Sequence, residues 1–356
     1  MSEIYLPLHD GKAPYWLLNR MKRLAEQIVK VIVIEYSEEE FLKRISNPIF
    51  FQSLSNVLGF DWNSSGATTV LTGVLKAVLN KPEFEIRVAG GKGANAIKTP
   101  EEIQRLAKEI NADSEKLVKF SRLSAKADNS ALIDGYSLYH HAIFFTEKQF
   151  TVVQQGMNPN VKLARRYHWD VYDDLPKLED VHSGIISDRI EREVINMLSS
   201  KSRESVKIGV DVLRDGNFRK DYQKLLSVIR AGKKIFLPRK IDWKAIEKAY
   251  ELQLEKFEDV LLIRGIGRET IRALALISEL IYNTEYDKQD PAKFCFAVGG
   301  KDGVPFPIRR EIYEQVIEFM KEILEQTKIE DFEKKKAFER LGKIYLQPSN
   351  GFTNPR

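Results

Sequence analysis

The sequence has only one cysteine, Cys295, among its 356 residues. A disulfide within the chain needs two cysteines, so none can form, and a cysteine-rich zinc site is excluded for the same reason. The sequence also lacks an apolar run near the ~20 residues that a membrane-spanning helix needs. Its first residues do not combine a charged segment with an apolar one, as a secretory signal does. These absences predict a soluble protein of the reducing cytoplasm.

A strong excess of one charge is missing as well. Lysine and arginine total 56 against 51 aspartates and glutamates, which gives a net charge of +5. This balance permits a polyanionic partner without requiring one. With 43% hydrophobic and 30% charged residues, the chain is an ordinary folded protein, long enough for two domains with cores of their own.

The stretch from Glu258 to Tyr282 predicts two helices joined by a glycine turn. Its apolar run over residues 260–263 is followed by Gly265 and Gly267, which permit a tight turn with positive φ. Apolar or small residues then recur at helical spacing, so the second helix should bury one stripe. They are Ile271, Leu274, Ala275, Ile277, Ser278 and Ile281. We expect a helix-hairpin-helix.

The start of the second helix is a predicted site for the backbone of a nucleic acid. Its unpaired N–H groups and the positive end of its dipole attract anions. The arginines around it should face solvent, and such a site holds a phosphodiester without reading bases. The predicted DNA-binding residues are Arg264, Gly265, Ile266, Gly267, Arg268, Thr270 and Arg272. The plainer alternative is a structural turn with solvated arginines, and RNA is an alternative partner because backbone contacts carry little information about the sugar.

The rest of the sequence predicts an α+β protein. Residues 1–184 should form a mixed domain with a small sheet, because residues 134–145 and 150–157 are typical of two strands joined by a short hairpin. An acidic, proline-bearing stretch follows Trp169 and indicates a linker or exposed loop. Residues 185–356 should form a mainly helical domain that contains the hairpin, with helices starting at about Ile185.

A polar cluster crosses the predicted strands. Asp134, His140, His141, Gln154 and Gln155 could converge if the strands pair, and His168 follows soon after. Neighbouring residues on a strand point to opposite faces, so at most one of the adjacent histidines enters a given site. Either the histidines are satisfied inside the sheet, or they serve a general acid–base or metal-assisted reaction. A divalent metal therefore stays a possible cofactor.

Two glycine-rich loops and one serine pair are candidate phosphate contacts. Lys92 lies in Gly90–Gly93 and Lys301 lies in Gly299–Gly303, but no Ser or Thr follows either lysine as in a Walker motif. Ser64 and Ser65 lie in a polar loop beside Trp62. They suit a helix cap or a phosphate or ribose pocket.

The hairpin resembles that of the helix-hairpin-helix DNA glycosylases. The resemblance implies a catalytic aspartate shortly after the hairpin helix, where Asp287 and Asp290 stand in this chain. Bifunctional members carry a lysine shortly after the second glycine, and this chain has Glu269 there, so Schiff-base lyase chemistry at that position is not expected. Asp290 before Pro291 is also typical of a plain helix cap.

Eight further strings together resemble the archaeal and bacterial family catalogued as domain of unknown function seven-six-three. They are LPLHDGKAPYWLL, FFQSLSNVLGFDWNSSGATTVLTGVLK, AGGKG, DGYSLYHHAIFF, VVQQGM, ARRYHW, GIGRETIRALALISELIY and DPAKFCFAVGGKDGVPF. The family name implies no activity. Asn63 stands where a histidine is expected in this family, which weakens a metal-ligand role for that loop.

These observations together predict a DNA-binding protein that acts in DNA repair or processing. The expected enzyme is a structure-selective nuclease or a base-excision glycosylase that grips the backbone through the hairpin. The alternative is a non-catalytic DNA- or RNA-binding accessory or scaffold protein.

Overall fold

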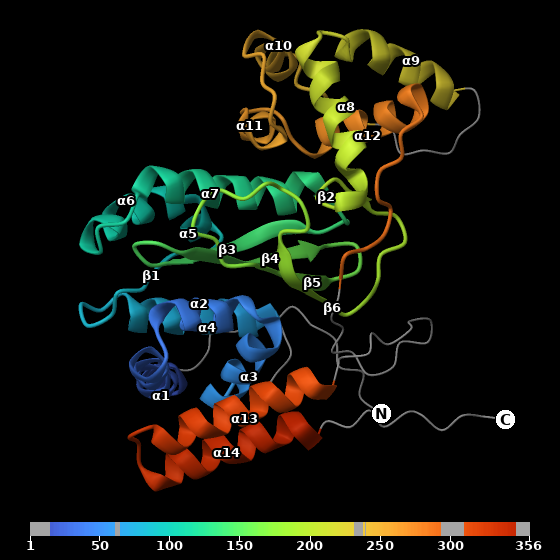
Figure 1. Ribbon diagram of the computed structural model, residues 1–356. Helices are drawn as coiled ribbons and strands as arrows, with labels where there is room; N and C mark the ends of the chain where they lie inside the picture. Colours follow the sequence, from blue (N-terminus) through green and yellow to red (C-terminus); the bar gives the residue numbers. More distant parts are fainter. Residues whose placement is uncertain (1–14, 61–64, 231–237, 239, 293–309, 347–356) are drawn as a thin grey trace, which may run out of the picture.

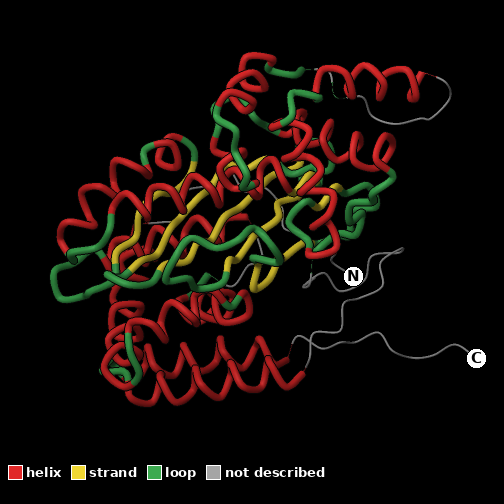
Figure 2. The backbone as a smooth tube through the Cα atoms, turned by 45° about the horizontal axis from the view of Figure 1, so that its top comes forward, coloured by secondary structure: helices red, strands yellow, loops and turns green. Residues whose placement is uncertain are grey.

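A computed structural model of the chain describes residues 15–60, 65–230, 238, 240–292 and 310–346. A five-stranded antiparallel sheet lies between two layers of helices (Figure 1). The tube view shows the strands running side by side through the middle of the molecule (Figure 2). The predicted α+β class is confirmed. In spatial order the strands are β1 (Arg87–Lys92), β3 (Ser137–Phe145), β4 (Phe150–Asn158), β5 (Leu163–Trp169) and β6 (His182–Ser187).

The predicted β-hairpin at residues 134–157 is confirmed and consists of strands β3 and β4. Ala142 lies opposite Val153, and the turn closes where the Thr146 N–H donates to the Gln149 carbonyl at 2.8 Å. Side chains alternate between the faces, since Ala142 and Val153 belong to one core and Ile143 to the other. The strand therefore carries buried residues on both sides.

One face of the sheet is covered by N-terminal helices, and two C-terminal helices pack on the outer side of these (Figure 1). Helices α13 and α14 pack on α1 and α3, although nearly the whole chain separates them in sequence. Their shared core contains Phe50, Phe51 and Met320. This layer holds α1 (Tyr15–Glu35), α2 (Glu38–Ser46), α3 (Pro48–Leu58), α4 (Ser65–Leu79), α13 (Arg310–Gln326) and α14 (Asp331–Leu346).

The other face is covered by α5 (Ala94–Ile97), α6 (Thr99–Glu109) and α7 (Ser114–Lys126), with a second group of helices stacked above them (Figure 1). A short π-helix, Ala127–Ala131, continues α7. The second group contains α8 (Arg203–Arg214), α9 (Phe218–Arg230), α10 (Trp243–Glu251), α11 (Phe257–Leu262) and α12 (Arg268–Tyr282).

Helix α12 lies at the centre of the second group and packs on α8 and α9. The predicted apolar stripe is buried from Ile271 to Ser278, while Ile281 is only partly buried. Gly209 of α8 lets the two helices approach, since an added Cβ there would lie 3.4 Å from the Leu274 Cβ. The hairpin helix is therefore the core of this group.

The expectation that the chain becomes helical at Ile185 is wrong up to Ser202. Residues 182–187 form the edge strand β6, and Ile195–Asn196 form β7, which pairs with β2 (Leu132–Ile133). The reason is tertiary, because the apolar pair Ile185 and Ile186 is buried against β5. A domain boundary at residue 185 stays a prediction. None of the described helices combines the length and apolar character needed to cross a membrane.

Candidate nucleic-acid interface

The hairpin consists of α11, the turn Ile263–Gly267 and α12. Gly265 has φ 99°, in the left-handed region that favours glycine. A Cβ at this position would also lie 2.4 Å from a carboxylate oxygen of Asp242, the residue that caps the start of α10. Ile266 is fully buried beneath the turn. Gly265 is thus required both by the backbone conformation and by the close approach of α10.

Gly267 leaves the start of α12 without a side-chain cap. Its backbone is extended, with φ −141° and ψ −167°, and no side chain forms a capping hydrogen bond there. The first hydrogen bond of the helix runs from the Ile271 N–H to the Gly267 carbonyl at 3.0 Å. An added Cβ on Gly267 would meet no atom within 4 Å. The backbone at this end of α12 is therefore open on the side where a Cβ would stand.

The three arginines around this end differ in their surroundings. Arg264 is exposed and has no hydrogen bond or ion pair with another described residue. Arg268 is half-buried, and its guanidinium donates to the carbonyls of Asn129 at 3.1 Å and Tyr136 at 2.5 Å. Arg272 approaches a Glu269 carboxylate oxygen at 3.3 Å. The expectation that all three face solvent is wrong for Arg268 and Arg272, because contacts within the chain hold them.

Two predicted DNA-binding residues lie inside the fold. Thr270 and Ile266 are buried, so neither side chain reaches a ligand. Arg268 instead joins the hairpin to the π-helix and to the loop before β3. These residues hold the turn in place, and Arg264, Gly265 and Gly267 remain as its accessible part.

A basic stripe on α7 lies against the hairpin and was missed from the sequence. Lys119, Arg122 and Lys126 share one helix face because they are three and four residues apart. Lys119 pairs with Asp259 of α11 at 3.0 Å, and Lys126 donates to the Ile266 carbonyl at 2.5 Å. Burial lowers the pKa of Lys126. The spacing of three basic residues at positions 119, 122 and 126 is the sequence signal that could have revealed this stripe.

Arg122 is the middle member of this stripe and the one without a partner among the described residues. It lines a groove of about 450 Å³ beside the end of α11. The groove is lined by Gln104, Glu115, Val118, Lys119, Arg122 and Leu262. We use the name hairpin surface for Arg264, Gly265, Gly267 and Arg122.

Two predicted catalytic aspartates meet at one arginine that the sequence did not point to. Arg165 of β5 contacts Asp134 at 2.9 Å and Asp290 at 2.7 Å, and the three side chains are fully buried. Burial raises the pKa of Asp134, and Arg165 opposes that rise. Burial also lowers the pKa of Arg165, but the two carboxylates outweigh it and raise this pKa above its usual range.

All four carboxylate oxygens of this cluster accept hydrogen bonds. Asp134 accepts from the Tyr136 N–H at 3.0 Å and from the Tyr167 hydroxyl at 2.7 Å. Besides Arg165, Asp290 accepts from the Glu191 N–H at 2.6 Å and from the Ala292 N–H at 3.0 Å. The cluster therefore fastens the segment after α12 to the sheet and leaves no carboxylate oxygen unbonded.

Asp287 is separate from this cluster. Its backbone N–H donates to the Ser202 hydroxyl at 2.8 Å, and its carbonyl accepts from the Asn196 N–H at 2.9 Å. Its carboxylate accepts from the Gln289 N–H at 2.9 Å, as in an ordinary turn. This geometry is that of a residue that stabilises a turn.

The adjacent histidines enter opposite faces of the sheet, as expected. His141 contacts the Ser121 hydroxyl of α7 at 2.8 Å and the Gln154 side-chain oxygen at 2.8 Å. Because that oxygen only accepts, His141 Nδ1 carries the proton and Nε2 accepts from Ser121. Burial lowers the pKa of His141, so the ring is neutral. The expected convergence with Asp134 is wrong, since Asp134 is bonded to Arg165 instead.

A buried acid completes the network of His141. Gln154 donates to Asp128 at 2.6 Å, and Asp128 also contacts His182 at 2.6 Å and the Trp169 N–H at 2.9 Å. Asp128 lies in the π-helix after α7. The network joins α7 to four strands of the sheet. Sequence reasoning missed its acid because a lone aspartate at a helix end gives no distinctive pattern.

His140 and His168 lie on the face toward α1–α4. His140 Nε2 lies 3.0 Å from the Thr72 hydroxyl, and His168 Nδ1 donates to the Ile45 carbonyl at 3.1 Å. The other ring nitrogen of each is buried without a hydrogen-bond partner. Burial lowers the pKa of His140 to about 3 and that of His168 well below its usual value. Among the described residues no three His, Cys, Asp or Glu side chains are grouped as metal ligands.

The loop around Lys92 does not cradle an anion with its backbone. The Gly90 N–H donates to Glu102 at 2.7 Å, and the Gly93 N–H donates to the Tyr139 carbonyl at 2.8 Å. Lys92 itself is exposed at the end of β1. Ser65 is the first residue of α4. The predicted contacts Ser64 and Lys301 lie outside the described residues.

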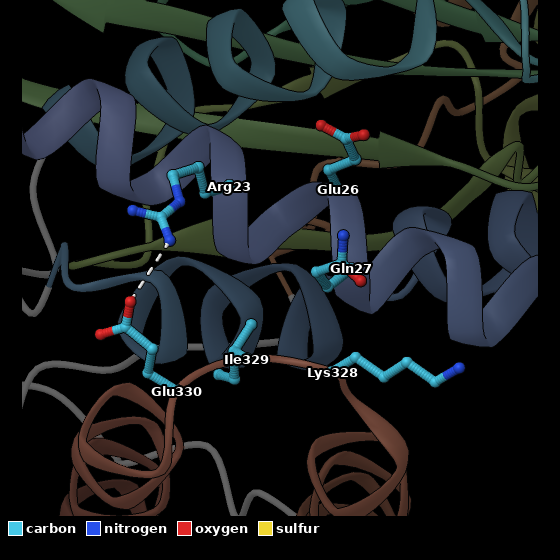
Figure 3. Close-up of a pocket in the computed structure, with 6 residues that line it drawn as sticks. All are labelled: Arg23, Glu26, Gln27, Lys328, Ile329 and Glu330. Carbon is cyan, nitrogen blue, oxygen red and sulfur yellow. Dashed lines mark ion pairs between the residues drawn. The ribbon is translucent and has the colours of Figure 1, made fainter.

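A second groove, of about 500 Å³, lies between α1 and the connection of α13 to α14 (Figure 3). Arg23 and Glu330 approach to 3.9 Å across it, and both side chains are exposed. Acidic and basic groups alternate along its lining, so the groove favours neither anions nor cations. Its lining residues are Arg23, Glu26, Gln27, Lys328, Ile329 and Glu330.

Comparison with known proteins gives one match. The family model described as protein of unknown function DUF763 matches residues 2–308. No curated protein and no solved structure matches the chain. The matched residues include the sheet and the whole hairpin.

Proposed function

This chain belongs to the DUF763 family, and the description of that family states no activity. We propose a function that is based on the charge and geometry of the hairpin surface. The protein binds the phosphodiester backbone of DNA and acts in DNA repair or processing. Contacts to phosphate position a protein on nucleic acid without reading bases, so the proposed binding is independent of sequence.

One observation carries the proposal, namely that α12 begins without a side-chain cap beside an exposed arginine. Free N–H groups and the positive end of a helix dipole favour an anion, and Gly267 allows a close approach to the backbone. Arg264 adds a full charge with no partner among the described residues. Arg122 on α7 adds another beside the end of α11. These groups suit the repeated phosphates of a nucleic acid.

The proposal has a catalytic and a non-catalytic form. In the first the protein is a nuclease or glycosylase, and in the second it is an accessory protein that binds DNA or RNA and a protein partner. One observation favours the second form. Asp134 and Asp290 are fully buried and accept hydrogen bonds at every oxygen, so neither is placed to take a proton from water or substrate.

Binding is tested by fluorescence anisotropy with labelled double-stranded DNA over a range of salt concentrations. Each phosphate contact contributes about −0.9 to the slope of log K against log salt. We expect Arg264→Ala to weaken binding to all sequences alike and to flatten the slope by about one contact. Arg23→Ala, an exposed arginine on the opposite layer, is the matched control. An unchanged slope in Arg264→Ala would overturn the proposal.

Catalysis is tested on the same DNA. Labelled single-stranded, double-stranded, flapped and damaged strands are incubated with Mg²⁺, Mn²⁺ or Zn²⁺. Cleaved or base-free products contradict the accessory form, and binding without product supports it. Competition between matched RNA and DNA strands then identifies the preferred nucleic acid.

A further inference from the structure

Arg166 of β5 is a buried arginine on the sheet face that carries α3 and α4. Its side chain is 1% exposed, and its guanidinium lies 4.7 Å from the ring centre of Phe51. It donates to the Thr68 hydroxyl at 3.4 Å and to the Gln52 side-chain oxygen at 3.3 Å. Both are long for hydrogen bonds, and Nε has no acceptor. No carboxylate among the described residues pairs with it.

This arrangement is costly for a protein that holds no anion there. An unpaired ion inside a protein loses most of its hydration, and a neutral amide, a hydroxyl and an aromatic ring restore only part of what is lost. Burial lowers the pKa of Arg166 to about 9, so the guanidinium keeps its charge at neutral pH. An anion beside the guanidinium of Arg166 would balance its positive charge.

The surroundings of Arg166 add further donors. Thr68 lies in the first turn of α4, which begins at Ser65. Gln155, opposite Arg166 on β4, donates to the Ser65 carbonyl at 2.9 Å and so ties this helix end to the sheet. The positive end of the α4 dipole therefore lies on the same side as the guanidinium. A helix start and an unpaired buried arginine are two independent features that favour an anion.

The nearest charged and titratable groups do not supply the missing negative charge. His168 is two residues along β5 and is neutral, with Nε2 unbonded. His140 lies opposite Gln155 on β3 and is also neutral. Lys92 and Lys76 act on His140 from the same side as further positive charges. Lys76 is itself paired with Glu102 at 2.6 Å, and none of these groups places a negative charge beside Arg166.

We propose that Arg166 and the first turn of α4 bind an oxyanion of the phosphate class. The Thr68 hydroxyl gives its proton to the Gln155 side-chain oxygen. The donors are therefore the guanidinium fork of Arg166 and the N–H groups of the first turn of α4, which are more than the two oxygens of a carboxylate would use. A tetrahedral anion with three or four oxygens matches this set. The anion is either free phosphate or the terminal phosphate of a larger ligand.

The test uses the full-length protein and its thermal unfolding in sodium phosphate, compared with sodium chloride at equal ionic strength. Phosphate that binds only the folded state raises Tm. We expect a rise of several degrees for the wild type and no rise for Arg166→Met. In chloride, Arg166→Met should be as stable as the wild type, because the substitution removes an unpaired buried charge.

Controls test whether the response is specific to Arg166 and to the anion. Arg23→Met removes an exposed positive charge outside both proposed sites and should keep the full response to phosphate. Sulfate should act like phosphate, and acetate should not. A larger rise with adenosine monophosphate than with phosphate supports a terminal phosphate, and an equal or smaller rise supports the free anion.

A second measurement covers the case in which Arg166→Met does not fold. Added phosphate bound to the wild type broadens its ³¹P resonance, and Arg166→Lys, which keeps the charge, should weaken this broadening. The proposal is wrong if the wild type neither gains stability nor broadens the resonance, or if Arg166→Met keeps the full gain. Loss of DNA binding in Arg264→Ala with an intact phosphate response shows that the two sites are separate.

Discussion

Arg165 and Arg166 are consecutive residues of β5 with opposite environments. Arg165 contacts two carboxylates on one face of the sheet, whereas Arg166 contacts none among the described residues on the other face. Both side chains are buried. Because successive residues of a strand point to opposite faces, one short segment contains a satisfied charge and an unsatisfied one. The first joins β5 to the segment after α12, and the second is the arginine that we propose binds an oxyanion.

Asp290→Asn should strongly destabilise the protein. The change removes one of the two charges that balance Arg165 and places an amide N–H₂ among donors. Breaking a buried ion pair by removing one partner costs about 3–5 kcal/mol. Urea unfolding followed by circular dichroism measures this cost. Asp287→Asn, on the same segment, is the control and should change stability by less than about 1 kcal/mol. Similar losses in the two variants would contradict a special role for Asp290.

Gly265 and Gly267 should respond differently to alanine. At Gly265 the positive φ and the 2.4 Å approach to Asp242 both oppose a methyl group, so Gly265→Ala should cost about 1–3 kcal/mol. At Gly267 the methyl meets no atom, and the backbone is extended. Gly267→Ala should therefore keep its stability but bind DNA more weakly, because the methyl lies between the backbone and a phosphate.

Thermal unfolding and DNA anisotropy on the two alanine variants separate these roles. Unchanged DNA affinity in a stable Gly267→Ala would mean that no phosphate approaches the backbone at the start of α12. An equally stable Gly265→Ala would contradict the close packing of the turn against α10.

The stability of the protein should fall as the pH drops below about 6.5, the usual pKa of histidine, and His140 should contribute to the fall. Burial holds the pKa of His140 near 3 in the folded state, so only the unfolded chain takes up this proton between the two values. The unfolded state is then favoured by about 1.4 kcal/mol per pH unit once the pH is well below 6.5.

His140→Gln removes this titration and keeps a polar side chain. We expect the free energy of unfolding of His140→Gln to fall less steeply between pH 7 and 5 than that of the wild type, measured in urea. Parallel curves would mean that His140 is protonated in the folded protein as readily as in the unfolded one.

Local patterns predicted the local structure. The apolar spacing of Leu274, Ala275 and Ile277 identified α12, and two strand-like runs on either side of the short turn at residues 146–149 identified β3 and β4, because both patterns depend on neighbours along the chain. Contacts between distant residues were not predictable in this way. Asp134, Arg165 and Asp290 meet although more than a hundred residues separate the first from the last. Asp290 before Pro291 indicated only a helix cap.

The site was predicted in part for the same reason. Gly265 and Gly267 are visible as a motif, whereas the partners of Arg268 are backbone carbonyls that any sequence provides. Residues 185–187 have only a weak strand pattern and precede a helical region in the sequence. They form a strand because they pair with β5. Arg122 could not be identified from the sequence, because its place in the site depends on the packing of α7 against α11.

Arg122→Ala should weaken DNA binding without destabilising the protein. Arg122 is exposed and unpaired among the described residues, so its loss breaks no internal contact. On the same stripe, Lys119 forms an ion pair with Asp259 and Lys126 donates to the Ile266 carbonyl. Lys126→Ala should therefore destabilise the turn between α11 and α12 and lower Tm. The two variants on one helix face thus distinguish a ligand contact from a structural one.

The measurement is the salt slope of DNA binding for Arg122→Ala, Arg264→Ala and the double variant. If a single duplex lies across the turn and α7, each substitution removes about one phosphate contact and the double variant about two. The affinity losses should then add, because the two side chains make separate contacts. If Arg122→Ala binds DNA with the slope of the wild type, the backbone crosses the hairpin without reaching α7. The hairpin surface then reduces to the turn and the start of α12.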